Sequence, residues 1–223
     1  MFWGKRASIS DDLKDWIYDS YDWADETFGA KWSASRTLIT PTRENFTASR
    51  GETSEIAQQI ADDIARLIPV RKIPVAPLDM LDPDLRHSYQ QIASVAGTYQ
   101  HDWDDPLIRY DPALMRTPVA FINTMVHELM HARLVNYVAL MPGGEGAHEL
   151  STDLHCITHG FGFFALEGPA IMGWSGYMTQ DSRAYALAVF LDRHEIDPGE
   201  ALSRLNARSA KALKRAIAEV QAD

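Results

Sequence analysis

Cysteine is almost absent from this chain of 223 residues, which has Cys156 and no other. A single thiol excludes an internal disulfide and favours a reducing compartment. The basic pair Lys5-Arg6 lies near the N-terminus, but no apolar stretch of signal-peptide length follows it. We therefore expect a cytoplasmic protein.

Long apolar runs are missing as well. No stretch reaches the roughly 20 clean apolar residues that a bilayer-spanning helix needs. Residues 160–178 come nearest, yet they include Glu167, Pro169 and five glycines. The sequence therefore predicts no membrane span.

Positive charge is scarce, because 21 Lys and Arg residues face 31 Asp and Glu residues and the formal net charge is −10. Such a chain repels phosphate backbones, so we expect no nucleic-acid partner. The basic residues from Arg204 to Arg215 recur at helical spacing, and we interpret them as one solvated helix face.

The sequence has enough apolar material for a folded core. Hydrophobic residues make up 46% and aromatic residues 10% of the chain, which are globular values. The length fits a single domain, and we find no internal repeat and no low-complexity tract. Within the expected domain, 1–223, the parts are N-terminal helices (1–69), a small sheet (70–116), two central helices (117–165) and C-terminal helices (177–223).

Local patterns place the elements within these parts. Amphipathic helices are expected over 10–29 and 53–69, separated by a β-like run at 37–40 and a polar loop at 42–51. Runs rich in β-branched and aromatic residues predict a small antiparallel or mixed sheet; they are 73–75, 92–99 and 107–110. A Gly-rich linker over 160–177, a helix capped by Thr179 and a last helical segment starting at Asp197-Pro198 complete the chain. The predicted fold class is α+β and mainly helical.

The run His127-Glu128-Leu129-Met130-His131 lies inside an apolar segment, 118–140, that has no Gly or Pro after its first residue. Thr117 and Pro118 form an N-cap and first-turn pair, so we expect one buried helix. A four-residue spacing brings both imidazoles to one helix face, with Glu128 to one side. Burying these groups without a partner is costly, and a zinc ion is the simplest partner. The alternative is a solvent-facing or hydrogen-bonded histidine pair.

A catalytic zinc site needs a third protein ligand. The best candidate is Glu149, and Asp153 lies one helical turn further on the same face, where it can accept the outer N–H of a ligating histidine. Competing third ligands lie close by in the sequence; they are His148, Asp153, His155 and His159. We interpret His155 and His159 as ordinary structural histidines, with oxyanion donation as the functional alternative.

HELMH followed by Glu149-Leu-Ser-Thr-Asp153 resembles the gluzincins, the thermolysin-like superfamily with a downstream ExxxD arrangement. The short intervening loop is closer to ImmA/IrrE-type peptidases and other small bacterial zincin-like proteins. The similarity covers 118–162 and, more weakly, 176–190. It implies a zincin-like core, with His127, His131 and Glu149 as zinc ligands, Glu128 as general base and Asp153 as the partner of a ligand.

The expected chemistry is hydrolysis of a peptide or protein substrate. Zinc acidifies a bound water, and Glu128 takes its proton and later passes it to the leaving amine. A second group is needed to stabilise the developing oxyanion. The candidate donors are His159, Tyr177 and Tyr185. By analogy with other zinc hydrolases, an edge strand at 93–99 is a candidate for holding substrate, although an ordinary core strand fits equally well.

Two other functions fit the same residues. A regulatory or scaffold domain of zincin-like fold would hold zinc without cleaving peptides, and four protein ligands would distinguish it from the enzyme. An amidase-like hydrolase would act on a non-peptide substrate. The sequence makes no prediction of oligomeric state.

Overall fold

The computed structural model describes residues 7–78, 97–100, 106–173 and 176–222. The chain is mainly helical with one small sheet, as the sequence predicts. The helices are α1 (Asp11–Phe28), α2 (Ala30–Ala34), α3 (Ser54–Leu67), α5 (Pro118–Leu134), α6 (His148–Cys156), α7 (Gly162–Ile171), α8 (Gln180–Arg193), α9 (Pro198–Leu202) and α10 (Ala207–Val220), with short turns η2 (Pro112–Arg116), η3 (Val138–Leu140), η4 (Gly144–Ala147) and the π-helical η5 (Ile157–Phe161).

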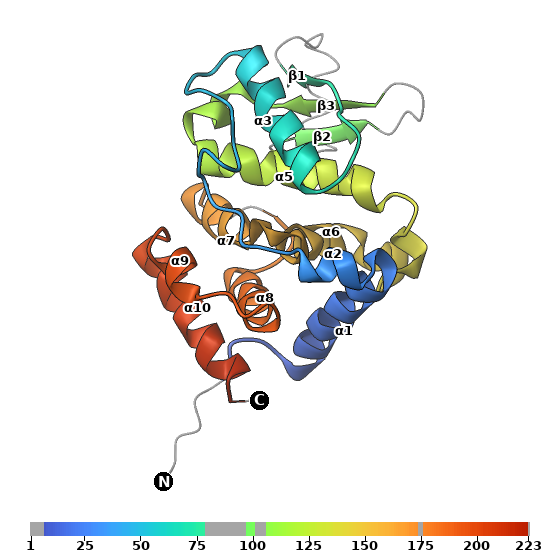
Figure 1. Ribbon diagram of the computed structural model, residues 1–223, viewed down its shortest axis with the longest axis vertical. Helices are drawn as coiled ribbons and strands as arrows, with labels where there is room; N and C mark the ends of the chain where they lie inside the picture. Colours follow the sequence, from blue (N-terminus) through green and yellow to red (C-terminus); the bar gives the residue numbers. More distant parts are fainter. Residues whose placement is uncertain (1–6, 79–96, 101–105, 174–175, 223) are drawn as a thin grey trace.

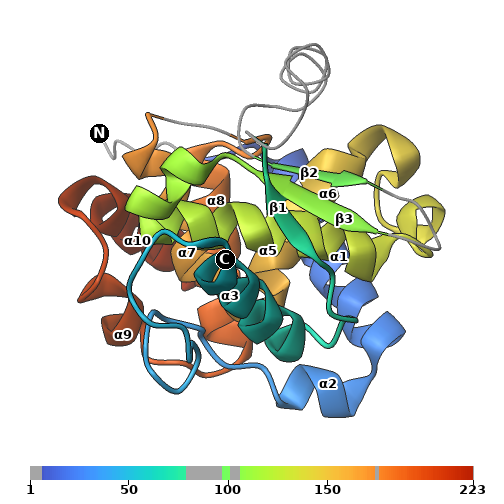
Figure 2. The ribbon, with the colours of Figure 1, turned by 90° about the horizontal axis from the view of Figure 1, so that it is seen from above.

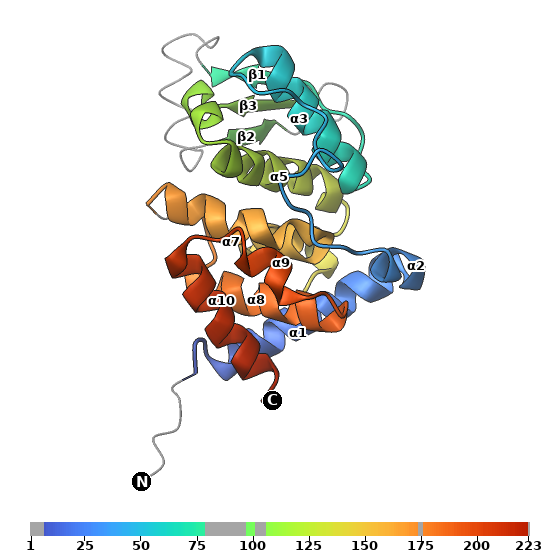
Figure 3. The same ribbon diagram turned by 60° about the vertical axis from the view of Figure 1, so that its left-hand side comes forward.

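The elements are stacked in layers around α5. The sheet and α3 form one end of the molecule, α5 follows, and α6 and α7 lie beneath it (Figures 1 and 3). The other end is built from α1, α8 and α10. Buried residues surround α5 on most of its circumference, so this helix lies in the middle of the apolar core.

The two predicted N-terminal helices are confirmed as α1 and α3. Gly29 ends α1 with a φ of 87°, and its backbone N–H donates to the Asp25 carbonyl oxygen. The Thr53 side chain caps α3 by accepting from the backbone N–H of Ile56. Both helices bury one face, on which α1 places Ile17 and Tyr21.

The sheet has three described strands in the order β1-β3-β2. They are β1 (Val75–Pro77), β2 (Gly97–Gln100) and β3 (Leu107–Tyr110). β1 runs parallel to β3 and β2 runs antiparallel to it, so the sheet is mixed and the purely antiparallel alternative is wrong. Figure 2 shows the strands lying over α5, which contacts β2. The candidate substrate strand at 93–99 overlaps β2, which is an edge strand among the three described strands. Residues 93–96 lie outside the described part.

The β-like run at 37–40 is not a strand. Ile39 donates its backbone N–H to the carbonyl oxygen of Gly160, and this extended segment packs on the π turn between α6 and α7. Gly160 has a φ of 98°, and a Cβ there would lie 2.4 Å from the Thr37 carbonyl oxygen. The glycine therefore allows two backbones to meet where a longer residue would separate them.

The expected Gly-rich linker over 160–177 is also wrong, because most of it forms the buried helix α7. Its glycines mark close packing. A Cβ on Gly162 would lie 2.5 Å from Leu187 Cδ1, and one on Gly168 would lie 2.8 Å from Asn123 Cβ. These glycines let α7 approach α8 and α5, and a glycine-rich composition alone does not distinguish such contacts from a flexible linker.

The C-terminal part follows its predicted signals. Thr179 caps α8 by accepting from the Ser182 N–H. The expected last segment is divided into α9 and α10, because the Asn206 side chain caps α10 by accepting from the N–H groups of Arg208 and Ser209. Among the described residues, no helix combines the length and the apolar character needed to cross a membrane.

Candidate metal centre

Two neighbouring helices supply the side chains of the candidate metal centre. His127 and His131 lie one turn apart on α5, and Glu149 lies in the first turn of α6, which packs against α5. The two imidazoles are mostly buried, with 16% and 13% of their side-chain surfaces exposed, whereas Glu149 is 40% exposed. The cluster is therefore anchored in the core and reaches solvent on the Glu149 side.

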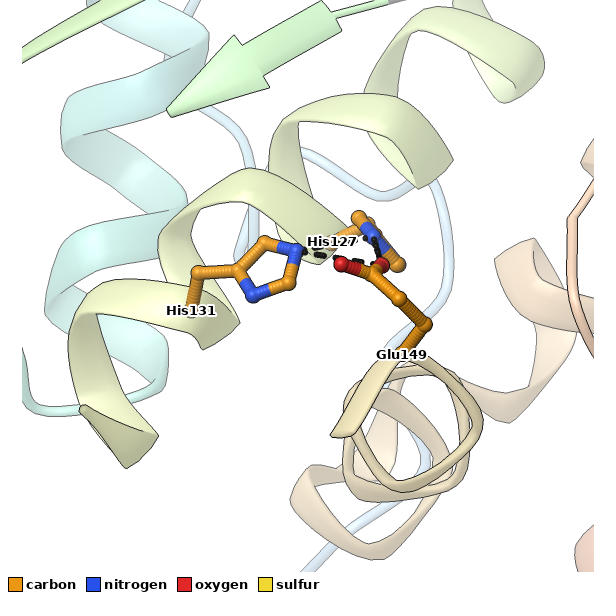
Figure 4. A group of neighbouring side chains, drawn as sticks. All are labelled: His127, His131 and Glu149. Atoms are coloured by element: carbon orange, nitrogen blue, oxygen red, sulfur yellow. Dashed lines mark hydrogen bonds and ion pairs between the residues drawn. The ribbon is translucent and has the colours of Figure 1, made fainter. Parts of the chain in front are cut away.

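Three potential ligand atoms converge between these helices (Figure 4). His127 Nε2 lies 3.1 Å from His131 Nε2 and 3.3 Å from Glu149 Oε2. The third side of the triangle, from His131 Nε2 to Glu149 Oε2, measures 3.5 Å. The structure thus brings together the three residues that the sequence suggested as ligands.

The size of this triangle fits a small divalent cation. Zinc–nitrogen and zinc–oxygen bonds are roughly 2.0–2.2 Å long, so ligand atoms in a tetrahedral site lie about 3.3–3.6 Å apart. The observed separations, from 3.1 to 3.5 Å, are close to this range. Two imidazoles and one carboxylate also form a ligand set that zinc binds. The cluster could therefore hold a metal ion, and zinc is compatible with both its geometry and its chemistry.

Asp153 holds the outer nitrogen of the first imidazole. Its Oδ1 lies 3.0 Å from His127 Nδ1. Its Oδ2 accepts from the backbone N–H groups of Tyr177 and Met178 and from Arg183 Nη2, the last at 2.6 Å. With Nδ1 donating to this carboxylate, His127 Nε2 faces the cluster and would offer its lone pair to a cation after losing its own proton.

The outer nitrogen of the second imidazole contacts other residues of α6. His148 Nε2 lies 3.3 Å and Thr152 Oγ1 lies 3.5 Å from His131 Nδ1. His148 therefore lies at the far side of the His131 ring and is not a member of the donor triangle.

The charges of the site are set by these contacts. Burial alone would lower the pKa of His127, but its hydrogen bonds with Asp153 and Glu149 outweigh burial and raise that pKa to about 10. Burial dominates at His131 and lowers its pKa. The pKa of the Glu149 carboxyl is lowered by hydrogen bonds with His127 and His131. Without a cation, the site holds one imidazolium, one neutral imidazole and one carboxylate at neutral pH.

Asp153 stays ionised although it is buried. Burial alone would raise the pKa of its carboxyl group, but the charge of Arg183 and the hydrogen bond with His127 outweigh burial and lower that pKa to about 2. Because Arg183 is only 2% exposed, little solvent screens this pair. The carboxylate and guanidinium therefore form a fixed charge pair behind His127.

Of the remaining residues that the sequence suggested for catalysis, some lie next to the cluster and others lie elsewhere in the structure. Glu128 follows His127 directly and is buried, with 6% of its surface exposed. The Tyr177 ring is stacked with the His127 ring at 6.2 Å between centroids and is half exposed. Tyr177 is thus the one suggested oxyanion donor that the structure places beside the described cluster.

The other two suggested oxyanion donors lie elsewhere. The His159 ring is buried against Phe28 and Trp32. The Tyr185 ring is buried against Tyr18 of α1. Both side chains are held in the packing around α1 and α2, so neither is assigned an oxyanion role.

His155, a competing third ligand, belongs to the same aromatic packing. Its ring lies 5.1 Å from Trp23, and its Nδ1 lies 3.1 Å from Thr158 Oγ1. Burial lowers the pKa of His155 to about 3 and that of His159 well below its usual value. Both side chains are neutral imidazoles within the packing, which agrees with their interpretation as ordinary structural histidines.

Sequence reasoning missed Arg183, Thr152 and the contact of His148 with His131. One signal for Arg183 was available, because it precedes an almost entirely buried run over 184–191 on α8. A cation next to such a run needs a carboxylate partner, although the sequence does not say which one.

Comparisons with protein-family models, curated proteins and solved structures found no match to this chain.

Proposed function

We propose that this chain is a zinc-dependent hydrolase that cleaves peptide bonds, with a zincin-like core and a metal site of gluzincin type. The observation that carries the proposal is the triangle of His127 Nε2, His131 Nε2 and Glu149 Oε2, with sides of 3.1–3.5 Å. Three protein ligands leave one position of a tetrahedral ion open, which is the pattern of catalytic sites.

A zinc ion held there would supply a Lewis acid that acidifies water and polarises a carbonyl group. Glu128 would accept the proton of the attacking water and deliver it to the leaving amine. The buried position of Glu128 beside His127 supports this role, because exclusion of solvent strengthens its interaction with a nearby positive charge. Asp153 would keep the His127 ring in one tautomer throughout.

The sheet suggests how an extended substrate would be held. β2 is at the end of the strand order and contacts α5, the helix that carries both histidines. A peptide could add to such an edge through backbone hydrogen bonds, which suit substrates of varied sequence. We therefore propose that the substrate is a peptide or an extended segment of a protein.

The test compares Glu128→Gln with Glu145→Gln, an exposed nearby control. Each purified protein is loaded with one equivalent of zinc and incubated with a broad peptide library, with cleavage read by mass spectrometry. Glu128→Gln should keep the zinc and lose roughly 10²–10⁴-fold in cleavage rate, as expected for removal of a general base. Glu145→Gln should cleave like the unchanged chain.

Equal cleavage by both variants would contradict the role of Glu128. Stoichiometric zinc without any cleavage that depends on Glu128 would favour the non-catalytic regulatory or scaffold domain. Hydrolysis of non-peptide amides alone, with the same dependence on Glu128, would favour the amidase-like alternative.

A further inference from the structure

A cavity lies against another face of α5, away from the candidate metal centre. It is a cavity of about 600 Å³ between the loop before α3, α3 itself, η2 and the start of α5. In Figure 1 this loop and the first turn of α5 lie on the same side of the molecule. Phe121, which lines the cavity, precedes His127 by six residues and so lies about 240° around the helix from it. The volume is within the range of small-molecule sites.

The inner wall of this cavity is apolar. Buried side chains of η2 and α5 form part of it, and half-buried side chains of α3 form another part. The apolar residues are Phe46, Ile56, Ile60, Met115, Phe121 and Ile122. Such a surface favours a hydrocarbon or aromatic group over water.

The rim carries an excess of positive charge. Three arginines line it, Arg43, Arg50 and Arg116, against one carboxylate, Glu52. Arg116 Nε already pairs with Glu52 Oε2 at 3.3 Å, whereas Arg50 has no hydrogen bond or ion pair with any residue in the described part of the chain. A cationic rim is unexpected in a chain with a formal net charge of −10. It indicates complementarity to an anion.

The cavity wall is preformed by contacts of the loop. Thr47 donates its backbone N–H to Asp63 Oδ2 at 2.7 Å, and Arg66 donates to the Asn45 carbonyl oxygen at 2.9 Å. Phe46 lies between Asn45 and Thr47 in the sequence, and its ring packs edge-on against the Phe164 ring. A preformed wall reduces the ordering cost of binding.

We propose that this cavity binds an amphipathic carboxylate, whose apolar body lies on the phenylalanine and isoleucine side chains and whose carboxylate meets the arginine rim. Arg50 supplies the uncommitted guanidinium. The site does not depend on the metal centre, because it uses none of the metal-binding residues.

The probe is octanoate, and binding is measured by isothermal titration calorimetry on the full chain. We expect saturable binding of one octanoate per chain. Acetate, which has the charge without the tail, and 1-octanol, which has the tail without the charge, should each bind at least tenfold more weakly. Affinity for octanoate should also fall with rising salt, because exposed arginines are screened.

Two variants test separately how the arginine rim and the apolar wall contribute to octanoate binding. The double variant Arg43→Gln with Arg50→Gln should weaken octanoate binding roughly tenfold, whereas the matched surface variant Arg208→Gln on α10 should leave it unchanged. Ile60→Trp should fill the cavity and abolish binding, with urea unfolding used to check that the variant is folded. No saturable binding of octanoate, equal binding of 1-octanol, or equal octanoate affinity in the double variant and the Arg208→Gln control would each overturn the proposal.

Discussion

Arg183 donates a hydrogen bond of 2.6 Å to Asp153 Oδ2, and the other oxygen of that carboxylate meets the outer nitrogen of His127. Arg183 is itself held in place, because it also donates to the carbonyl oxygens of Ala165 and Met178. A chain of fixed polar groups thus runs from the buried side of α8 to the candidate metal centre. Each member restricts the next, so the orientation of the His127 ring is set by the fold.

Replacing Arg183 with methionine should destabilise the protein strongly. The variant removes the guanidinium that pairs with the buried Asp153 carboxylate, and breaking such a buried pair typically costs about 3–5 kcal/mol in the free energy of unfolding. Arg193→Met is the matched control on the same helix. It removes exposed ion pairs with Asp22 and Asp25 and should cost less than about 1 kcal/mol. Urea unfolding of both variants measures the difference, and equal losses would argue against the fixed polar chain.

The ligand role of Glu149 can be separated from the contact made by its neighbour His148. Glu149→Gln replaces the anionic carboxylate of the donor triangle with a neutral amide, which is a much weaker metal ligand, and should abolish stoichiometric zinc binding at micromolar concentration. His148→Gln removes only a contact with the outer nitrogen of His131, so zinc should remain at one equivalent, with affinity weakened by at most roughly 10–100-fold. A competition titration with a coloured chelator measures both. Loss of zinc in His148→Gln alone would mean that the ligand set is wrong.

Zinc binding should release a proton. Without metal, the hydrogen bonds with Asp153 and Glu149 outweigh burial and raise the folded-state pKa of His127 from its usual value of 6.5 to about 10. At pH 8 the folded, metal-free protein therefore carries this proton, and a zinc ligand must lose it. We expect release of about one proton per zinc, measured by calorimetry in two buffers of different ionisation enthalpy at pH 8. Equal binding enthalpies in both buffers would contradict the raised pKa.

The same shift affects the stability of the metal-free protein. Because the folded pKa lies above the unfolded value, the stabilisation from protonated His127 is fully present below about pH 6.5 and is lost as pH rises toward 10. His127→Ala should remove this alkaline dependence from the unfolding free energy.

His155 should have the opposite pH dependence. Its folded pKa is lowered to about 3, so the unfolded chain takes up a proton first as pH falls below 6.5. Stability should then be lost between pH 6.5 and 3, by about 1.4 kcal/mol per pH unit for this histidine. His155→Phe should reduce that slope and cost little at pH 7, because His155 Nε2 is buried without a partner in the described structure. We expect the zinc affinity of His155→Phe to be unchanged. Loss of zinc binding would indicate that His155 is a metal ligand.

The sequence predicts the parts of the site that follow from helix geometry. A spacing of four residues places His127 beside His131 on any α-helix, and the same spacing places Glu149 and Asp153 on one face of α6. The predicted cap at Thr179 likewise acts within one turn of the chain. These features need no knowledge of the fold.

Features that depend on contacts between distant parts of the chain could not be predicted from local spacing. His155 and His159 have the same spacing as His127 and His131, but their face of the chain turns toward the aromatic side chains of α1 and α2. Arg183 meets Asp153 across 30 residues. The glycines of α7 resemble a linker in composition, and only the position of α8 explains them.

Anomalous diffraction at the zinc edge from crystals of the zinc-loaded chain tests the central claim most directly. The proposed site predicts one strong peak within about 2.0–2.2 Å of His127 Nε2, His131 Nε2 and a Glu149 carboxylate oxygen, with no fourth protein ligand. A peak bound by four side chains, or located away from the two histidines of α5, would contradict the proposed metal site and with it the assigned chemistry.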